Sequence, residues 1–121
     1  MIARTLALAG IFGLLVLQFL WHATIAPPLS AAPWIYAGFF CIPLLPSLLL
    51  LALRHRTAWL VGGLAALLYF CHGVMVAMNV PQWRALALIE IALSVLVVVA
   101  ASWNGLRSRF ARKRIPAAEG R

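Results

Sequence analysis

Charged residues are absent from one long stretch of this chain, residues 5–53. That stretch is far longer than the roughly 20 residues that cross the hydrocarbon core of a bilayer, so it must be divided. The Pro27-Pro28 pair, with Pro33 shortly after it, cannot lie inside one continuous helix. The pattern therefore predicts a first membrane span over 5–26 and a second over 32–53.

The second half of the chain repeats this pattern of apolar runs separated by short polar breaks. Arg54-His55-Arg56 is long enough to join two antiparallel helices, and residues 79–84 form the next break. The breaks predict a third span over 57–78 and a fourth over 85–104. The expected fold is all-α: an integral membrane protein with four transmembrane helices in an up-down antiparallel bundle.

Composition agrees with a lipid environment. Of the 121 residues, 65% are hydrophobic and 10% are charged, whereas soluble domains average about 45–50% and about 25%. Such a chain has too few polar groups to cover its surface in water. We expect one transmembrane domain over 1–106, followed by a basic juxtamembrane segment and disordered tail over 107–121.

The distribution of charge predicts an orientation. The chain has ten Lys and Arg residues and two acidic residues, for a net charge of +8. The basic residues lie in short breaks and in the tail, which argues against nucleic-acid binding. In a four-span arrangement Arg4, Arg54, Arg56 and the C-terminal cluster fall on one side, and Arg84 alone falls on the other. The positive-inside rule then places both termini in the cytoplasm. We expect the cluster to contact anionic lipid headgroups at the cytoplasmic face; its members are Arg107, Arg109, Arg112, Lys113 and Arg114.

The N-terminus permits a second interpretation. Arg4 followed by a long apolar run also fits a secretory signal peptide. The run is longer than the usual 7–15 residues of such peptides, and it contains Gln18 and Trp21. We therefore expect an uncleaved first helix.

Tryptophan and proline mark further features of the spans. Most of the tryptophans fall near expected span ends, where indole rings favour the headgroup region: Trp21, Trp34, Trp83 and Trp103. Pro43 and Pro46 lie midway along the second span, where each removes a backbone donor and predicts a kink. The kink is a candidate hinge, or a static bend set by packing.

Polar side chains inside the apolar runs are the candidate functional residues. On this map Gln18, His72 and Glu90 come from three helices and lie roughly 9 Å below the outer helix ends, at 1.5 Å per residue. Tyr69 and Ser94 lie one turn deeper on the faces that carry His72 and Glu90. Ionisable groups inside a membrane are costly, face the bundle interior and often mark functional sites. We expect Glu90 either to exchange a proton or bind a cation, with His72 as partner, or to form a static pair that fixes the helix register.

Other chemistries fit the sequence less well. A zinc site needs three or four ligands, and His22 lies about a turn away from Glu90 and His72. The sequence carries no phosphate-binding glycine loop and no nucleophile elbow. Cys41 and Cys71 form no Cys-x-x-Cys pair, which argues against thiol redox chemistry. We expect no metal, no cofactor and no enzymatic activity.

Four segments carry a resemblance to a known family: Pro43-Leu-Leu-Pro46, the basic turn at Arg54, Leu68-Tyr69-Phe70-Cys71-His72-Gly73-Val74, and Leu88-Ile89-Glu90 with Leu93-Ser94. The family comprises small predicted bacterial inner-membrane proteins and is known as domain of unknown function 2069. The similarity covers about residues 40–110 and, more loosely, the first span. The resemblance implies four spans and a bacterial inner-membrane location, and it implies no activity.

Three functional hypotheses follow. The first is a non-enzymatic membrane protein that acts through a membrane protein partner or by self-association, which the short loops favour. The second is a small proton-coupled transporter that works as an oligomer, with Glu90 as the proton site. The third is an accessory protein that binds a lipid or quinone near His72 and Tyr69.

Overall fold

Four helical spans make up the computed structural model, which describes residues 1–30 and 32–113. Every regular element in these residues is helical. In chain order the elements are α1 (Ile2–Leu20), the π-helical η1 (Trp21–Ile25), α2 (Pro33–Cys41), the 3-10 turn η2 (Ile42–Leu44), α3 (Leu45–Ala52), α4 (Ala58–Asn79), the 3-10 turn η3 (Pro81–Trp83) and α5 (Arg84–Lys113).

The number of spans agrees with the prediction from the sequence. The structure has four helices long and apolar enough to cross a membrane, over Ile2–Ile25, Pro33–Ala52, Ala58–Asn79 and Pro81–Ala111. The last helix differs most from its expected limits, because α5 continues beyond Asn104 to Lys113. The apolar run ends near 104, but no proline interrupts the residues that follow, and arginine, alanine and leucine sustain a helix well.

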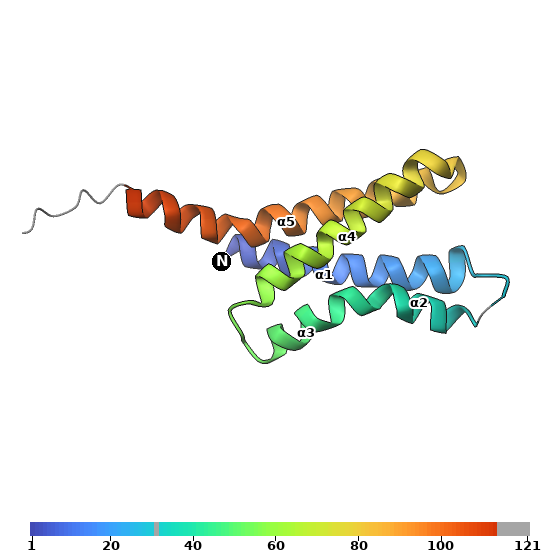
Figure 1. The fold of residues 1–121 in the computed structure, drawn as a ribbon, viewed down its shortest axis with the longest axis horizontal. Helices are drawn as coiled ribbons and strands as arrows, with labels where there is room; N and C mark the ends of the chain where they lie inside the picture. Colours follow the sequence, from blue (N-terminus) through green and yellow to red (C-terminus); the bar gives the residue numbers. More distant parts are fainter. Residues whose placement is uncertain (31, 114–121) are drawn as a thin grey trace, which may run out of the picture.

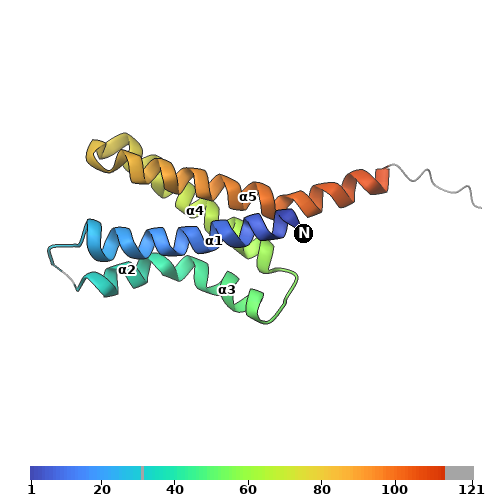
Figure 2. The same ribbon diagram turned by 180° about the vertical axis from the view of Figure 1, so that it is seen from behind.

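The spans run alternately in opposite directions (Figures 1 and 2). In both views α1 lies between α5 on one side and the α2–α3 span on the other. Figure 1 shows α4 running obliquely from its connection with α3 to the hairpin that it forms with α5. The N-terminus and the α3–α4 connection lie at one end of the bundle, and the α4–α5 hairpin lies at the other.

The second span is interrupted where the prolines fall. The 3-10 turn η2 contains Pro43, and Pro46 lies in the first turn of α3. Just before this turn, the carbonyl of Phe40 accepts a hydrogen bond of 2.5 Å from the hydroxyl of Tyr69 on α4. A neighbouring helix thus supplies a donor at the disturbed backbone, which is how membrane helices tolerate proline. Whether the bend moves as a hinge stays a prediction.

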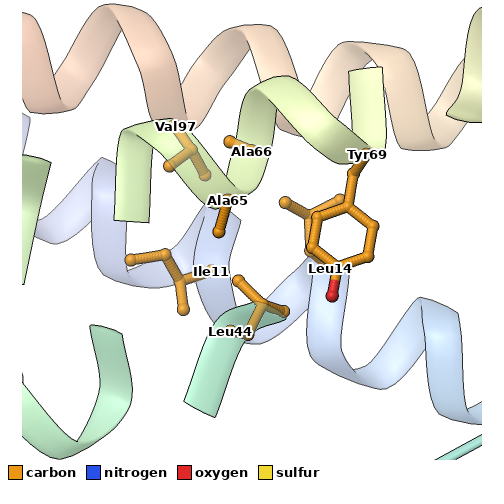
Figure 3. Packing of buried hydrophobic residues seen from close by; sticks show 7 residues of the cluster. All are labelled: Ile11, Leu14, Leu44, Ala65, Ala66, Tyr69 and Val97. Atoms are coloured by element: carbon orange, nitrogen blue, oxygen red, sulfur yellow. The ribbon is translucent and has the colours of Figure 1, made fainter. Parts of the chain in front are cut away.

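The apolar core lies where α1, α4 and α5 meet the 3-10 turn η2. Its buried side chains are Ile11, Leu14, Leu44, Ala65, Ala66, Tyr69 and Val97 (Figure 3). Small residues let the helices approach closely here. A Cβ added to Gly10 would lie 2.5 Å from Val97 Cγ2, and one added to Gly62 would lie 2.8 Å from Ser47 Oγ. Such close backbone contacts favour helix association in lipid.

Trp21 departs from the expected position at a span end facing the headgroups. Its side chain is only 3% exposed and packs inside the bundle, whereas Trp34 is 69% exposed. Trp21 begins the π-helical segment, in which the Ala26 N–H bonds the Trp21 carbonyl five residues back. Trp21 itself still has helical geometry, and its N–H bonds the carbonyls of Leu17 and Gln18. It therefore lies on the same helix face as buried Gln18, three residues earlier, and points into the bundle although it lies near the end of the span.

Candidate functional site

Glu90 on α5 is fully buried and bridges three helices. Its carboxylate accepts a hydrogen bond from Gln18 Nε2 on α1. On α4, His72 Nδ1 lies 3.0 Å from Glu90 Oε2 and 3.1 Å from Oε1. We call Gln18, His72 and Glu90 the polar cluster. The structure thus brings together the three residues that the sequence assigned to one layer.

A glycine sets how closely the two helices of the hairpin approach at this depth. A Cβ added to Gly73 would lie 2.9 Å from Ile91 Cγ1, 3.1 Å from the Ala87 carbonyl oxygen and 3.3 Å from Glu90 Oε2. The bare backbone of α4 therefore lies directly against α5 beside the carboxylate. Any side chain at position 73 would separate the helices that hold Glu90 and His72.

Tyr69 and Ser94, which the sequence also assigned to the site, do not contact the carboxylate. The Tyr69 hydroxyl is bonded to Phe40, as described above. The Ser94 hydroxyl donates to the backbone carbonyl of Glu90 over 2.7 Å, which is the bond to the residue four positions earlier that serine often makes in helices. Their hydroxyl groups bond backbone carbonyls, so a supporting role for Tyr69 and Ser94 at the cluster stays a prediction.

An aromatic group that the sequence did not predict packs against the polar cluster. His22 Nδ1 donates to the Gln18 carbonyl over 2.9 Å, and the His22 ring stacks on Phe40 with centroids 3.9 Å apart. The rings of Trp21 and His22 lie 5.9 and 6.0 Å from that of His72. Position 22 is one helical turn after Gln18, so its place beside the polar cluster could have been predicted from the spacing. The contact of Phe40 with His22 depends on the path of α2, which the spacing does not predict.

Gln18 has one polar atom without a partner. Its side chain is fully buried, and Oε1 has no hydrogen-bond partner among the residues described. The amide nitrogen donates to Glu90 Oε1 in the present orientation. Rotating the amide by 180° would place Oε1 against Glu90, where it could accept a hydrogen bond from a protonated carboxyl group.

His72 is the most accessible member of the polar cluster, with its side chain 20% exposed. It lines a hollow of about 220 Å³ together with Phe39, Phe40, Ile42, Pro43, Leu68 and Tyr69. The hollow is apolar apart from His72 and Tyr69, so it suits lipid chains or a lipid-soluble molecule. Among residues 1–30 and 32–113, no three His, Cys, Asp or Glu side chains are placed to share a metal ion.

The C-terminal basic cluster is only partly described. Arg107 and Arg109 are exposed on α5. The side chains of Arg112 and Lys113, and the whole of Arg114, lie outside the described part of the chain. Contact of these residues with lipid headgroups stays a prediction.

Comparison with known families bears on the whole bundle. Residues 6–108 match the family model described as Predicted membrane protein (DUF2069). The chain belongs to this family. The range matched to DUF2069 contains the second and third spans, most of the first and the last, and the whole polar cluster. The match confirms the resemblance inferred from the sequence.

The family description supplies a membrane setting for the four apolar helices and names no activity. The chain matches no curated protein and no solved structure. Its function must therefore be argued from the geometry of the site.

Proposed function

We propose that this chain is a multi-pass protein of the bacterial inner membrane that acts without catalysing a reaction, by contacting a partner membrane protein or a second copy of itself. The observation that carries the proposal is the shortness of the connections. Only residues 26–32, 53–57 and Val80 separate the helical elements of the described chain. The sides and ends of the spans are thus nearly the whole surface on which it can act.

The proposed orientation has both termini in the cytoplasm. Arg4, Arg54 and Arg56 line one hollow at the end of the bundle that holds the N-terminus. Arg84 lies in the hairpin at the other end, where its Nε bonds the Ala77 carbonyl. This asymmetry supports a cytoplasmic location for the arginine-rich end. A C-terminal reporter that is active only in the cytoplasm should be active, and an inactive reporter beside an active periplasmic one would contradict the orientation.

In this proposal the polar cluster acts as a clasp, meaning that its hydrogen bonds hold α1, α4 and α5 in one register. Glu90 is bonded to residues on both α1 and α4, so sliding either helix past α5 would take away one of the two partners of a carboxyl group in an apolar medium. Breaking a buried pair costs several kcal/mol in soluble proteins and about 1 kcal/mol or less per hydrogen bond within membranes. The clasp thereby holds the outward-facing side chains in one arrangement that a partner can recognise.

Photo-crosslinking in native membranes tests the proposal. A benzophenone amino acid is placed at one exposed position in each of three elements: Phe39 on α2, Leu49 on α3 or Leu68 on α4. Leu14, which is fully buried, is the control. We expect one face to give a protein adduct of a single mass, either twice that of the chain or the sum of the chain and one partner. Adducts to lipid alone from all three positions would contradict the proposal.

A second candidate function is proton exchange at Glu90, as in a proton-coupled transporter. Two observations favour it: His72 is both accessible and in contact with Glu90, and the Gln18 amide can serve either protonation state of the carboxyl group by rotating. A proton arriving at His72 would then have a route to Glu90, with no break in the hydrogen bonding of the cluster.

Infrared difference spectroscopy on protein in lipid separates the two candidates. Glu90→Gln removes the carboxyl band and so assigns it. A Glu90 band that appears and disappears around neutral pH, with a substrate-dependent proton flux lost in Glu90→Gln, would establish the second candidate. A carboxylate that stays ionised into the acid range, with unchanged crosslinking in Glu90→Gln, would establish the first.

A further inference from the structure

A strongly basic hollow of about 450 Å³ lies at the end of the bundle that holds the N-terminus and the α3–α4 connection. We call it the basic hollow. It is lined by cationic and aromatic side chains from α1, the α3–α4 connection and α4, namely Arg4, Arg54, His55, Arg56 and Trp59, over apolar residues of α3 and α5. Elements distant in sequence thus converge on one concave, positively charged surface.

No carboxylate of the described residues balances this charge. The sequence contains two acids, Glu90 and Glu119. Glu90 is bound to Gln18 and His72 towards the opposite end of α4, and Glu119 lies outside the described part of the chain. Clustered guanidinium groups repel one another, so an arrangement of three of them around a hollow favours an anion from outside the chain.

Other groups at the hollow can add hydrogen bonds to those of the arginines. His55 Nδ1 accepts from the Thr57 backbone N–H over 3.3 Å and lies 2.6 Å from the Thr57 hydroxyl, so Nε2 is the ring nitrogen that does not bond Thr57 and can donate to a ligand. The first turn of α4 contains Trp59, has no acidic residue and has no side-chain cap. The Ala58 N–H bonds the His55 carbonyl over 3.1 Å, so the start of α4 contributes chiefly the positive end of a helix dipole.

We propose that the basic hollow binds a phosphate group. Paired arginines bind phosphate oxygens with forked, charge-assisted hydrogen bonds, and a helix N-terminus adds to this attraction. The phosphate could belong to a lipid headgroup or to a soluble ion. The apolar side of the hollow, formed by Leu51, Ala100 and Ala101, fits the glycerol and upper acyl chains of an anionic phospholipid. The site does not depend on the orientation of the chain, because both leaflets present phosphate.

Native mass spectrometry of the full chain tests the site by titration with phosphatidylglycerol, with phosphatidylcholine as the zwitterionic reference. The test variant is Arg4→Gln/Arg56→Gln, which removes two lining guanidinium groups and leaves Arg54, whose backbone φ is positive at 53°, unchanged. The matched control is Arg107→Gln/Arg109→Gln, which makes the same change of charge on α5 outside the hollow. Thermal unfolding in neutral lipid verifies that both variants fold.

We expect phosphatidylglycerol to bind the test variant about tenfold more weakly than the unmodified chain. The loss in the control should be clearly smaller, because Arg107 and Arg109 attract anionic headgroups only as part of the C-terminal cluster and do not line the hollow. Competition with inorganic phosphate distinguishes the two sources of the phosphate group. If millimolar inorganic phosphate does not displace phosphatidylglycerol, the site binds the lipid headgroup. If it does displace the lipid, the site binds a soluble phosphate. Equal losses of phosphatidylglycerol binding in both variants would mean general electrostatic attraction, and equal binding of the two lipids would mean that the charge of the headgroup plays no part. Either result would overturn the proposal. If the test variant does not fold, Arg4→Lys/Arg56→Lys keeps the charge without the fork, and unchanged binding there also overturns it.

Discussion

The polar cluster and the basic hollow differ in how their charged side chains are paired. At the polar cluster a single carboxylate is fully buried, and donors from two other helices are bonded to it. At the basic hollow three guanidinium groups are exposed, and the described chain offers them no carboxylate. The carboxyl group of the polar cluster is paired within the chain, whereas the guanidinium groups of the basic hollow depend on partners outside it.

This difference follows from the solvent around each region. An unpaired charge in the hydrocarbon is costly, so Glu90 needs partners in its own chain. Charges at the membrane surface can be paired by headgroups and screened by salt. Mutations at the polar cluster should therefore change stability in any lipid, whereas mutations at the basic hollow should change chiefly what the protein binds.

The largest expected effect concerns the close contact of α4 with α5 at the polar cluster. Gly73→Ala places a methyl group 3.1 Å from the Ala87 carbonyl, so the helices must separate, and we expect a loss of about 2 kcal/mol in unfolding free energy. Gly38→Ala on α2 is the matched control, because nothing lies within 4 Å of its added Cβ. Its effect should stay within about 0.5 kcal/mol. Steric trapping in bicelles measures both, and equal effects would show that the contact is loose.

A smaller effect should reveal that Gln18 and His72 act on the same carboxylate. Gln18→Leu and His72→Phe each leave Glu90 one partner, whereas the double variant leaves it none. We expect the double variant to lose about 1 kcal/mol more than the sum of the single variants. Gln18→Leu combined with Ser47→Ala is the control pair, since Ser47 bonds the Ala58 carbonyl elsewhere in the bundle. Additivity in both pairs would falsify the shared clasp.

The smallest expected effect lies at the basic hollow. Arg54 has a positive φ of 53°, a left-handed conformation that is strained for residues with a Cβ. Arg54→Gly should be more stable than Arg54→Ala by about 0.5 kcal/mol, since the greater freedom of glycine in the unfolded chain offsets part of the relief. Both variants lose the same charge, so the difference isolates the backbone. A more stable alanine variant would contradict the strain.

Much of the architecture could be predicted from the sequence, because charges and prolines are excluded from spans and mark their limits. The breaks at the Pro27-Pro28 pair and at Arg54 divided the chain correctly into helices. The end of α5 was less predictable, since the limit of an apolar run does not determine where a helix stops. Orientation relative to a membrane remains a proposal, because it depends on the lipid on each side of the protein.

The sequence predicted the depth of the candidate site in the bundle, but it predicted the contacts of the side chains there only in part. Counting residues from the breaks placed Gln18, His72 and Glu90 at one level, because helical rise is constant. The contact of Phe40 with His22 depends on the path of α2 relative to α1, which spacing along the chain does not determine. The bond from the Tyr69 hydroxyl to the Phe40 carbonyl depends on the same path.

The placement of His72 and Glu90 on neighbouring helices of one hairpin has a consequence for biosynthesis. A lone carboxylate meets a barrier when its helix partitions from the translocon into lipid. Here α4 emerges first and carries His72, so the imidazole precedes Glu90 along the nascent chain. The two can pair as soon as the hairpin closes at Val80, and Gln18 can join when the hairpin docks on α1. The acid thus has a partner on its own hairpin when it enters the bilayer.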